Sequence, residues 1–210
     1  MTTDIDLVLI MHRDEVFKPT NTGRLIADVF PINTYAFEWS RTQPPNDLLH
    51  LLKEPTRYPV VVFPPPENYA GTVYREVPAH VDKRRLTLIL LDGTWKQARK
   101  MFKSSTWLHS LPLLVLSNPQ QALYSVRQAA AEGYLATAEV TAALLKECGK
   151  AEAAVRLADY FAVFNQHYVA TRMNSALHQS EHHLRLQHVV QKLANSPGCE
   201  ASGNGEALQR

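Results

Sequence analysis

The residues best suited to chemistry in this sequence are a carboxylate and a set of basic side chains that follow it closely. Asp92 ends the apolar run 86–91, which is typical of a strand buried in a parallel sheet. A helix is predicted from Trp95, and two i,i+4 pairs of cations would share one of its faces: Lys96, Arg99, Lys100 and Lys103. In open α/β sheets ligands bind beyond the carboxyl ends of the strands, so we expect a ligand site at Asp92.

Each of these residues also has a purely structural interpretation. Asp92-Gly93 is a common turn pair, and Thr94 with Gln97 forms a capping-box pattern at a helix start. Trp95 either stacks on a base or packs the helix on the sheet, and its place in the first helical turn favours packing. The basic residues either contact phosphates or form a solvated helix face, and Arg99 and Lys100 are the preferred phosphate contacts.

A second polar cluster follows the first apolar run, residues 7–10. His12 and Glu15 either hold a substrate or pair with each other. Asn21-Thr22-Gly23 is a tight turn ahead of a helix, and its backbone N–H groups could bind a phosphate or a carboxylate. Arg24 adds a cation for the same kind of group.

The pattern of apolar segments predicts how these clusters are positioned. Strands are expected at 4–11, 34–39, 60–63, 86–91 and 113–116, with residues 67–80 irregular. Helices are expected at 25–30, 46–52, 95–103, 137–148, 150–172 and 175–193, with Thr137 capping its helix. This alternation predicts an α/β fold with a mainly parallel sheet and helices on both faces.

Composition excludes several classes of protein. With 210 residues, a net charge of +2 and 45% hydrophobic residues, the chain is an ordinary globular protein whose nucleic-acid affinity would depend on local charge. Cys148 and Cys199 lie outside any CxxC, and no apolar stretch nears the roughly 20 residues of a membrane helix. A cytoplasmic setting is expected. No GxGxxG, P-loop, GxSxG or HExxH motif occurs.

The histidines near the C-terminus give a weak metal pattern. His178 and His182 are four residues apart, which would place them on one face of the predicted helix. Only Glu181 adjoins them as a further ligand, so we predict a solvated or RNA-facing surface and no metal.

Three ordered motifs resemble the DTW-domain family. The central one is Asp92-Gly93-Thr94-Trp95, and the N-terminal one is His12-x-x-Glu15 followed by Asn21-Thr22-Gly23-Arg24-Leu25. The late one is Ser125-x-Arg127 followed by Gly133-x-Leu135-Ala136-Thr137-x-Glu139. Together they extend the resemblance over about residues 5–172. Many bacterial members also carry a cysteine-rich, zinc-binding segment ahead of the first strand, whereas the first cysteine here is Cys148.

The resemblance implies a tRNA-uridine aminocarboxypropyltransferase. Such enzymes move the 3-amino-3-carboxypropyl group of S-adenosylmethionine to N3 of a uridine and release methylthioadenosine. The implied fold is SPOUT-like, with a knot near the C-terminal part of the sheet. The implied catalytic domain spans residues 1–172. The chain pattern adds a helical extension of 173–194 and a disordered tail of 195–210, which is rich in Ser, Gly and Asn. The alternatives are an RNA methyltransferase that uses the same cofactor and a non-catalytic RNA-binding module.

The resemblance also distributes roles among the motif residues. Asp92 is expected to take the N3 proton of the uridine. The expected cofactor contacts among them are Ser125, Arg127, Gly133, Leu135, Thr137 and Glu139. Topology alone adds Pro65, which follows the end of a predicted strand and is expected to form one wall of the cofactor pocket. The expected substrate contacts are His12, Glu15, Asn21, Thr22, Gly23, Arg24, Thr94, Trp95, Lys96, Arg99 and Lys100. For Thr137 and Glu139, helix capping and the helix dipole offer a structural alternative.

Overall fold

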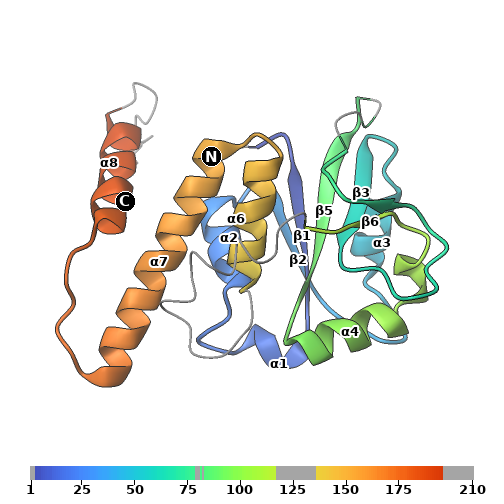
Figure 1. The fold of residues 1–210 in the computed structure, drawn as a ribbon, viewed down its shortest axis with the longest axis horizontal. Coiled ribbons are helices and arrows are strands. Elements are labelled where there is room, and N and C mark those ends of the chain that lie inside the picture. Colours follow the sequence, from blue (N-terminus) through green and yellow to red (C-terminus); the bar gives the residue numbers. More distant parts are fainter. Residues whose placement is uncertain (1–2, 79–80, 82, 117–135, 196–210) are drawn as a thin grey trace, which may run out of the picture. The chain divides into compact units, whose positions relative to one another are not determined.

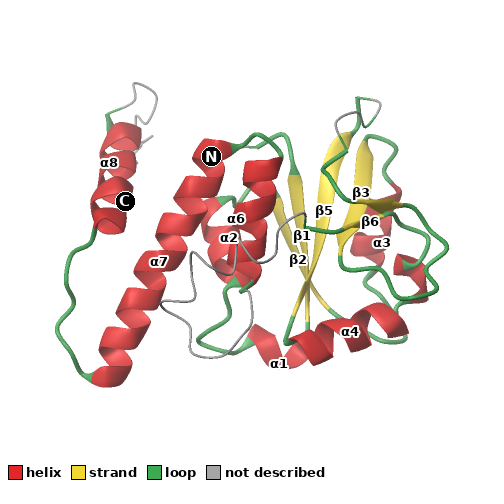
Figure 2. Cartoon of the chain, in the orientation of Figure 1, coloured by secondary structure: helices red, strands yellow, loops and turns green. Residues whose placement is uncertain are grey.

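A six-stranded parallel sheet organises the described part of the chain, in a computed structural model that describes residues 3–78, 81, 83–116 and 136–195 (Figures 1 and 2). The strands are β1 Asp6–Met11, β2 Thr34–Glu38, β3 Arg57–Val62, β4 Val73–Tyr74, β5 Arg85–Asp92 and β6 Leu113–Leu114. Their order is β2-β1-β5-β3-β6-β4, and every pairing among them is parallel. The prediction of an α/β fold with a parallel sheet is confirmed.

The longest strand, β5, lies between β1 and β3. Its side chains are buried from Leu86 to Leu90 because helices cover the sheet on both faces. The register pairs Met11 of β1 with Asp92, so both strands end at the same level. The loops that follow β1 and β5 therefore start side by side at the carboxyl edge of the sheet.

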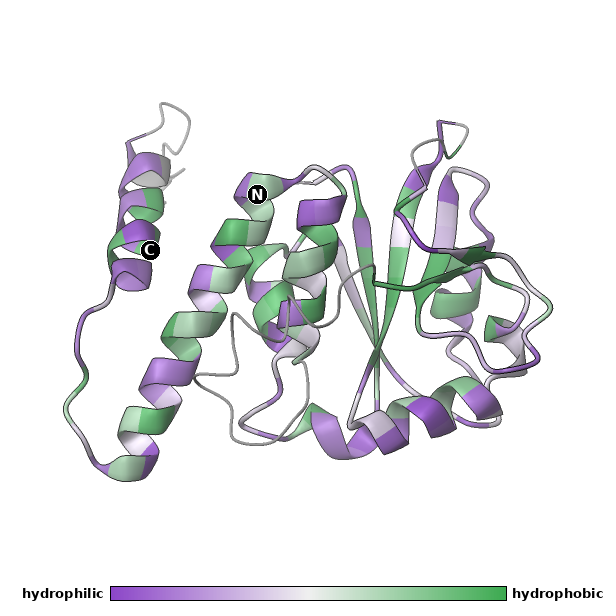
Figure 3. Ribbon diagram, viewed as in Figure 1, coloured by the Kyte–Doolittle hydropathy of each residue, from purple (hydrophilic) through white to green (hydrophobic). Residues whose placement is uncertain are grey.

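The described helices are α1 Arg13–Val16, α2 Gly23–Val29, α3 Asn46–Lys53, α4 Trp95–Ser104, α6 Thr137–Glu147, α7 Ala151–Met173 and α8 Glu181–Ala194. Of these, α2, α3, α4 and α6 cover the two faces of the sheet. One apolar cluster joins α3 and α4 to the alternate residues Val8, Ile10 and Ile89. The intervening residues of the same strands point to the other face, where α2 and α6 pack together (Figure 1). Figure 3 shows the apolar residues along the central strands.

Several predicted elements differ from those observed. Residues 67–80 contain β4, which forms because Val73 and Tyr74 pair with β6. The loop after β1 contains the short helix α1, which His12 caps by accepting a hydrogen bond from the Asp14 N–H. The last helix starts at Glu181 rather than at residue 175. Asn174 adopts a left-handed backbone (φ 48°) directly after α7, a conformation that asparagine tolerates and that ends a helix.

The chain divides into two compact units within α7, since one unit ends at Phe161 and the other begins at Ala162. The catalytic domain of residues 1–172 and the tail from residue 195 stay predictions. Residues 117–135, between β6 and α6, lie outside the described residues, so the SPOUT-like knot also stays a prediction. None of the described helices combines the length and the apolar character needed to cross a membrane.

The amino edge of the sheet is held by a buried ion cluster. Asp6 is only 1% exposed, and its carboxylate contacts the guanidinium groups of Arg57 and Arg85, the latter at 2.9 Å. These residues begin β1, β3 and β5. Partial burial lowers the pKa of Arg57, and the Arg85 charge lowers it further. The carboxylate thus balances two charges that have lost part of their hydration.

We predict that Asp6→Ala lowers the free energy of unfolding by about 3 kcal/mol, because it leaves the largely buried Arg57 guanidinium with only the half-exposed Glu54 carboxylate (Nε–Oε2 2.7 Å) as a counter-ion. Urea denaturation measures this change. The matched control is Asp4→Ala, which removes an exposed carboxylate that pairs with Lys150 at 2.7 Å and should cost less than about 1 kcal/mol. Equal losses in the two variants would contradict the conclusion that the ion pairs of Asp6 hold these three strands together.

Candidate active site

Asp92 lies at the carboxyl end of β5 and is only 4% exposed. Its side chain points to the face of the sheet that α2 and α6 cover. Asn21 donates a hydrogen bond from Nδ2 to Asp92 Oδ2 (2.9 Å), and the Thr137 hydroxyl donates one to Oδ1 (2.5 Å). One carboxylate therefore joins residues that are 71 and 45 positions away in the chain.

Gly23 allows this close approach. A Cβ atom at position 23 would lie 2.7 Å from Asp92 Oδ2, which is too close unless the carboxylate moves. It would also lie 3.1 Å from Asn21 Oδ1, which is an unusually tight contact. Asn21 is fixed in turn, because its Nδ2 also donates to the Glu15 carbonyl (3.0 Å) and its Oδ1 accepts from the Arg24 N–H (3.2 Å). The Asn-Thr-Gly turn is thus built around the carboxylate.

The surroundings of Asp92 make it more basic than an ordinary aspartate. Burial is the largest effect and raises the pKa of Asp92. The hydrogen bonds from Thr137 and Asn21 act in the opposite direction but are weaker, and the nearby charges of Glu15 and Lys18 raise and lower the pKa respectively. The carboxylate also lies by the first residues of α2 and α6, where helix N-termini favour negative charge. It is oriented by neutral donors and has an increased affinity for a proton.

His12 and Glu15, which the sequence analysis considered as a possible internal pair, have separate partners. His12 Nδ1 accepts from the Asp14 N–H (3.2 Å) and lies 3.2 Å from Gln97 Nε2, while its ring stacks on Trp39 with centroids 5.8 Å apart. Glu15 forms an ion pair with Lys18 at 2.5 Å. Both residues shape the loop that carries Asn21.

Thr94 and Gln97 form the predicted capping box at the start of α4. The Thr94 hydroxyl accepts from the Gln97 N–H (3.3 Å), and the Thr94 N–H donates to Gln97 Oε1 (2.8 Å). Trp95 then stacks on Phe63 with centroids 5.5 Å apart but stays 45% exposed. Trp95 therefore packs against the protein and also presents surface to solvent.

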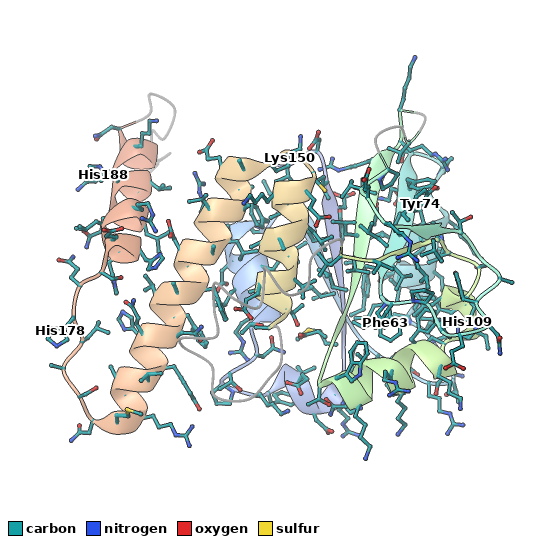
Figure 4. All side chains as sticks on the ribbon, in the orientation of Figure 1. Phe63, Tyr74, His109, Lys150, His178 and His188 are labelled. Atoms are coloured by element: carbon teal, nitrogen blue, oxygen red, sulfur yellow. The ribbon has the colours of Figure 1, made fainter. Side chains whose placement is uncertain are left out.

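The basic residues of α4 lie on its exposed face. Ala98, Met101 and Phe102 are buried on the opposite face of the helix. Lys96, Arg99, Lys100 and Lys103 are exposed, and none of them forms an ion pair or hydrogen bond with the described residues. Figure 4 shows nitrogen-tipped side chains that point away from the protein along α4. This face offers positive charge that no carboxylate of the described chain neutralises.

The remaining predicted residues have varied surroundings. Thr22 Oγ1 accepts from the Ala138 N–H (3.4 Å) and so links the starts of α2 and α6. Arg24 donates to two loop carbonyls, and Pro65 is exposed in the segment after β3. Thr137 is the first residue of α6, and the cap is Ala136, so the prediction that Thr137 caps this helix was wrong. Four predicted cofactor contacts lie outside the described residues: Ser125, Arg127, Gly133 and Leu135.

The sequence pattern placed His178 and His182 on one face of a helix predicted at 175–193, but the observed helix α8 starts at Glu181. His178 lies in the connection before α8 and His182 within α8, so they do not share a helical face. Within the described residues no group of three or more His, Cys, Asp or Glu could hold a metal ion.

Comparison with protein families gives a match over most of the chain. The family model described as DTW domain matches residues 1–169. The chain belongs to the DTW-domain family. No solved structure was found that matches it. Membership of this family is consistent with a role in tRNA modification.

Glu139 is the second buried carboxylate at the carboxyl edge of this DTW domain. It is 8% exposed, and its Oε2 accepts from the Ala136 N–H (2.7 Å), which is the capping bond expected at the start of α6. Its Oε1 is buried and has no hydrogen-bond partner among the described residues. Burial raises the pKa of Glu139 to about 6, while the Ala136 N–H acts in the opposite direction. One oxygen is therefore committed to the helix, while the other is buried without a donor from the described residues.

The sequence analysis missed the role of Lys18 and a second contact of Gln97, both of which shape the DTW site. Lys18 pairs with Glu15 and also lowers the pKa of Asp92, and its spacing of three residues from Glu15 could have indicated the pair. Gln97 Nε2 reaches Asp14 Oδ2 (3.1 Å), which connects α4 to α1 across 83 positions. No pattern in the sequence indicates this second contact.

We predict that Glu139→Gln changes the dependence of stability on pH. The native pKa of about 6 lies above the ordinary 4.5, so the folded state holds the proton more tightly, and wild-type stability falls as pH rises from 4.5 to about 6. Glutamine keeps the acceptor for Ala136 and does not ionise. Urea denaturation across this range should show wild type losing about 1 to 2 kcal/mol relative to the variant. Parallel stability curves would contradict the increased proton affinity of Glu139.

Proposed function

We propose that this DTW-domain protein transfers the 3-amino-3-carboxypropyl group of S-adenosylmethionine to N3 of a uridine in tRNA, in the cytoplasm. The products are 3-(3-amino-3-carboxypropyl)uridine and methylthioadenosine. The observation that supports this most strongly is the buried Asp92 carboxylate, held by Asn21 and Thr137 from the two other motifs of the family.

The chemistry requires a base more than a covalent catalyst. When bound, S-adenosylmethionine supplies a carbon made electrophilic by the adjacent sulfonium: the N3–C bond forms, the S–C bond breaks, and methylthioadenosine leaves with the bonding pair. The imide N3–H of uridine is a poor nucleophile until its proton is removed. The proton must go to an acceptor within hydrogen-bond reach, and Asp92 is our candidate.

The geometry at Asp92 suits that task. Two neutral donors, on Asn21 and Thr137, fix the orientation of the carboxylate without neutralising its charge. Because burial raises the pKa of Asp92, the carboxylate is a better proton acceptor than an exposed aspartate. Each carboxylate oxygen has a second lone pair, so both hydrogen bonds can persist while the N3 proton is accepted.

Glu139 fits the charge of the proposed co-substrate. A buried carboxylate oxygen without a donor is costly unless a ligand satisfies it. S-adenosylmethionine carries an α-ammonium group that could do so. We therefore propose Glu139 as a cofactor contact. We also retain Thr137 and Pro65 as proposed cofactor contacts. We add, from the family resemblance, Ser125, Arg127, Gly133 and Leu135, together with the SPOUT-like knot that would hold the cofactor.

The tRNA would bind along the carboxyl edge of the sheet. The exposed cations of α4 suit the phosphate backbone, and the exposed part of Trp95 suits contact with a base. The loop of His12, Glu15, Asn21, Thr22, Gly23 and Arg24, together with Thr94, would position the uridine over Asp92.

We predict that Asp92→Asn lowers the rate of transfer about 10²- to 10⁴-fold, because asparagine keeps the shape of the side chain but accepts no proton. Mass spectrometry of nucleosides and small products, after incubation of tRNA with labelled S-adenosylmethionine, measures it. The control is Asp47→Asn, an exposed aspartate in the first turn of α3. Unchanged transfer in Asp92→Asn would eliminate Asp92 as the base.

The same assay separates the alternative functions. Release of S-adenosylhomocysteine in place of methylthioadenosine would identify a methyltransferase. Binding of tRNA with no change in either product would identify a non-catalytic RNA-binding module.

We predict that replacing Lys96, Arg99 and Lys100 together by alanine weakens tRNA binding and lowers the slope of log K against log salt by roughly 2 to 3, since each phosphate contact contributes about 0.7 to 0.9. Filter binding over a range of salt concentrations measures both. The control replaces three exposed lysines near the opposite edge of the sheet: Lys53, Lys83 and Lys146. An equal effect in the control variant would show that only total charge matters.

A further inference from the structure

Phe17 is the most exposed of the large hydrophobic side chains in the described part of the chain, at 85%. It directly follows α1, in the loop that supplies Asn21 to Asp92. A single exposed hydrophobic residue is common on protein surfaces and by itself indicates nothing. Phe17 differs from such a residue in two ways: its backbone is held by hydrogen bonds on both sides, and it lies in the loop that contacts Asp92.

The backbone on both sides of Phe17 is held in place. Arg24 Nη2 donates to the carbonyls of Val16 (3.3 Å) and Lys18 (3.4 Å), the two neighbours of Phe17. The Lys18 N–H donates to the Glu15 carbonyl (3.1 Å), and the Asn21 N–H donates to the Lys18 carbonyl (3.0 Å). The loop thus presents an aromatic ring to solvent from a fixed backbone, which reduces the entropy lost when a ligand packs on it.

The same loop is joined to the cationic helix. Gln97 of α4 donates to Asp14 Oδ2 (3.1 Å) and lies 3.2 Å from His12 Nδ1. Asp14 is the second residue of the four-residue helix α1, and Phe17 directly follows this helix, which adjoins α4 at the carboxyl edge of the sheet (Figure 1). Phe17, Asp92 and the exposed cations of α4 therefore belong to one edge of the protein.

We propose that Phe17 is a base-stacking residue that takes the nucleobase next to the reacting uridine in a single-stranded part of the tRNA. This inference rests on the proposed function, because it assumes an RNA substrate. Aromatic rings beside cations are the usual means of binding single-stranded nucleic acid, since every base has a face that can stack. An apolar protein partner fits this edge less well, because it would desolvate the cations of α4, which form no ion pair within the described part of the chain.

Burial indicates which base Phe17 takes. The uridine whose N3 meets Asp92 must enter an enclosed place, since Asp92 is 4% exposed. Phe17 projects almost fully into solvent, so it suits a neighbouring base that stays outside. Trp95 cannot stack on the same base. It packs on Phe63, which directly follows β3, whereas Phe17 follows β1 on the other side of β5.

The test compares Phe17→Ala, Phe17→Leu and Phe17→Trp with wild type, using an unmodified tRNA transcript as the probe. We expect Phe17→Ala to weaken tRNA binding about 5- to 100-fold and to raise KM for tRNA, while KM for S-adenosylmethionine and the salt slope stay unchanged. Phe17→Trp should restore binding, and its added fluorescence should be quenched by tRNA. Phe17→Leu, which is apolar but not aromatic, should not restore it.

The matched control is Ile32→Ala, which removes another exposed apolar side chain just ahead of β2, at the amino edge of the sheet. It should bind tRNA as wild type does. Wild-type tRNA affinity in Phe17→Ala, or full affinity in Phe17→Leu, would overturn the stacking role.

Two outcomes separate the stacking role of Phe17 from the transferase activity. If no aminocarboxypropyl transfer occurs but Phe17→Ala still weakens tRNA binding, stacking stands and the transferase assignment falls. If transfer occurs and Phe17→Ala leaves KM for tRNA unchanged, the stacking role alone falls.

Discussion

The hydrogen bonds of the Asp92 carboxylate are the interactions on which the rest of the site depends. Asn21 and Thr137 reach this carboxylate from the starts of two helices, and Gly23 leaves it the room to approach. A buried carboxylate is costly unless each oxygen has a donor, so the three segments must come together for any of them to be stable there. The positions of the α2 and α6 starts and the orientation of the Asp92 carboxylate therefore depend on the same hydrogen bonds.

The two edges of the sheet use buried aspartates in opposite ways. At the amino edge, Asp6 contacts two guanidinium groups, and its charge serves to hold three strands. At the carboxyl edge, the donors that the described residues offer to the Asp92 carboxylate are a side-chain amide and a hydroxyl, and neither carries a charge. The same residue type is structural where cations surround it and suited to proton transfer where neutral donors do.

Helix α4 connects the core to the proposed RNA surface. Its buried face packs Ala98, Met101 and Phe102 on the sheet, and its other face presents cations. Gln97 lies between these faces, closes the capping box with Thr94 and contacts α1. The orientation of the cationic face is thus determined by packing and capping at the point where β5 ends, next to Asp92.

Local periodicity and short motifs were enough to predict the parallel α/β fold, the strand that ends at Asp92, the capping box at Thr94 and the DTW family. Long-range contacts determine that Asn21 and Thr137 bond to Asp92, that one Glu139 oxygen has no donor among the described residues, and that β4 pairs with β6. The tertiary structure also shows that His178 and His182 share no helix. Such outcomes depend on contacts between residues far apart in the chain, and local sequence carries no record of which distant group will complete a hydrogen bond.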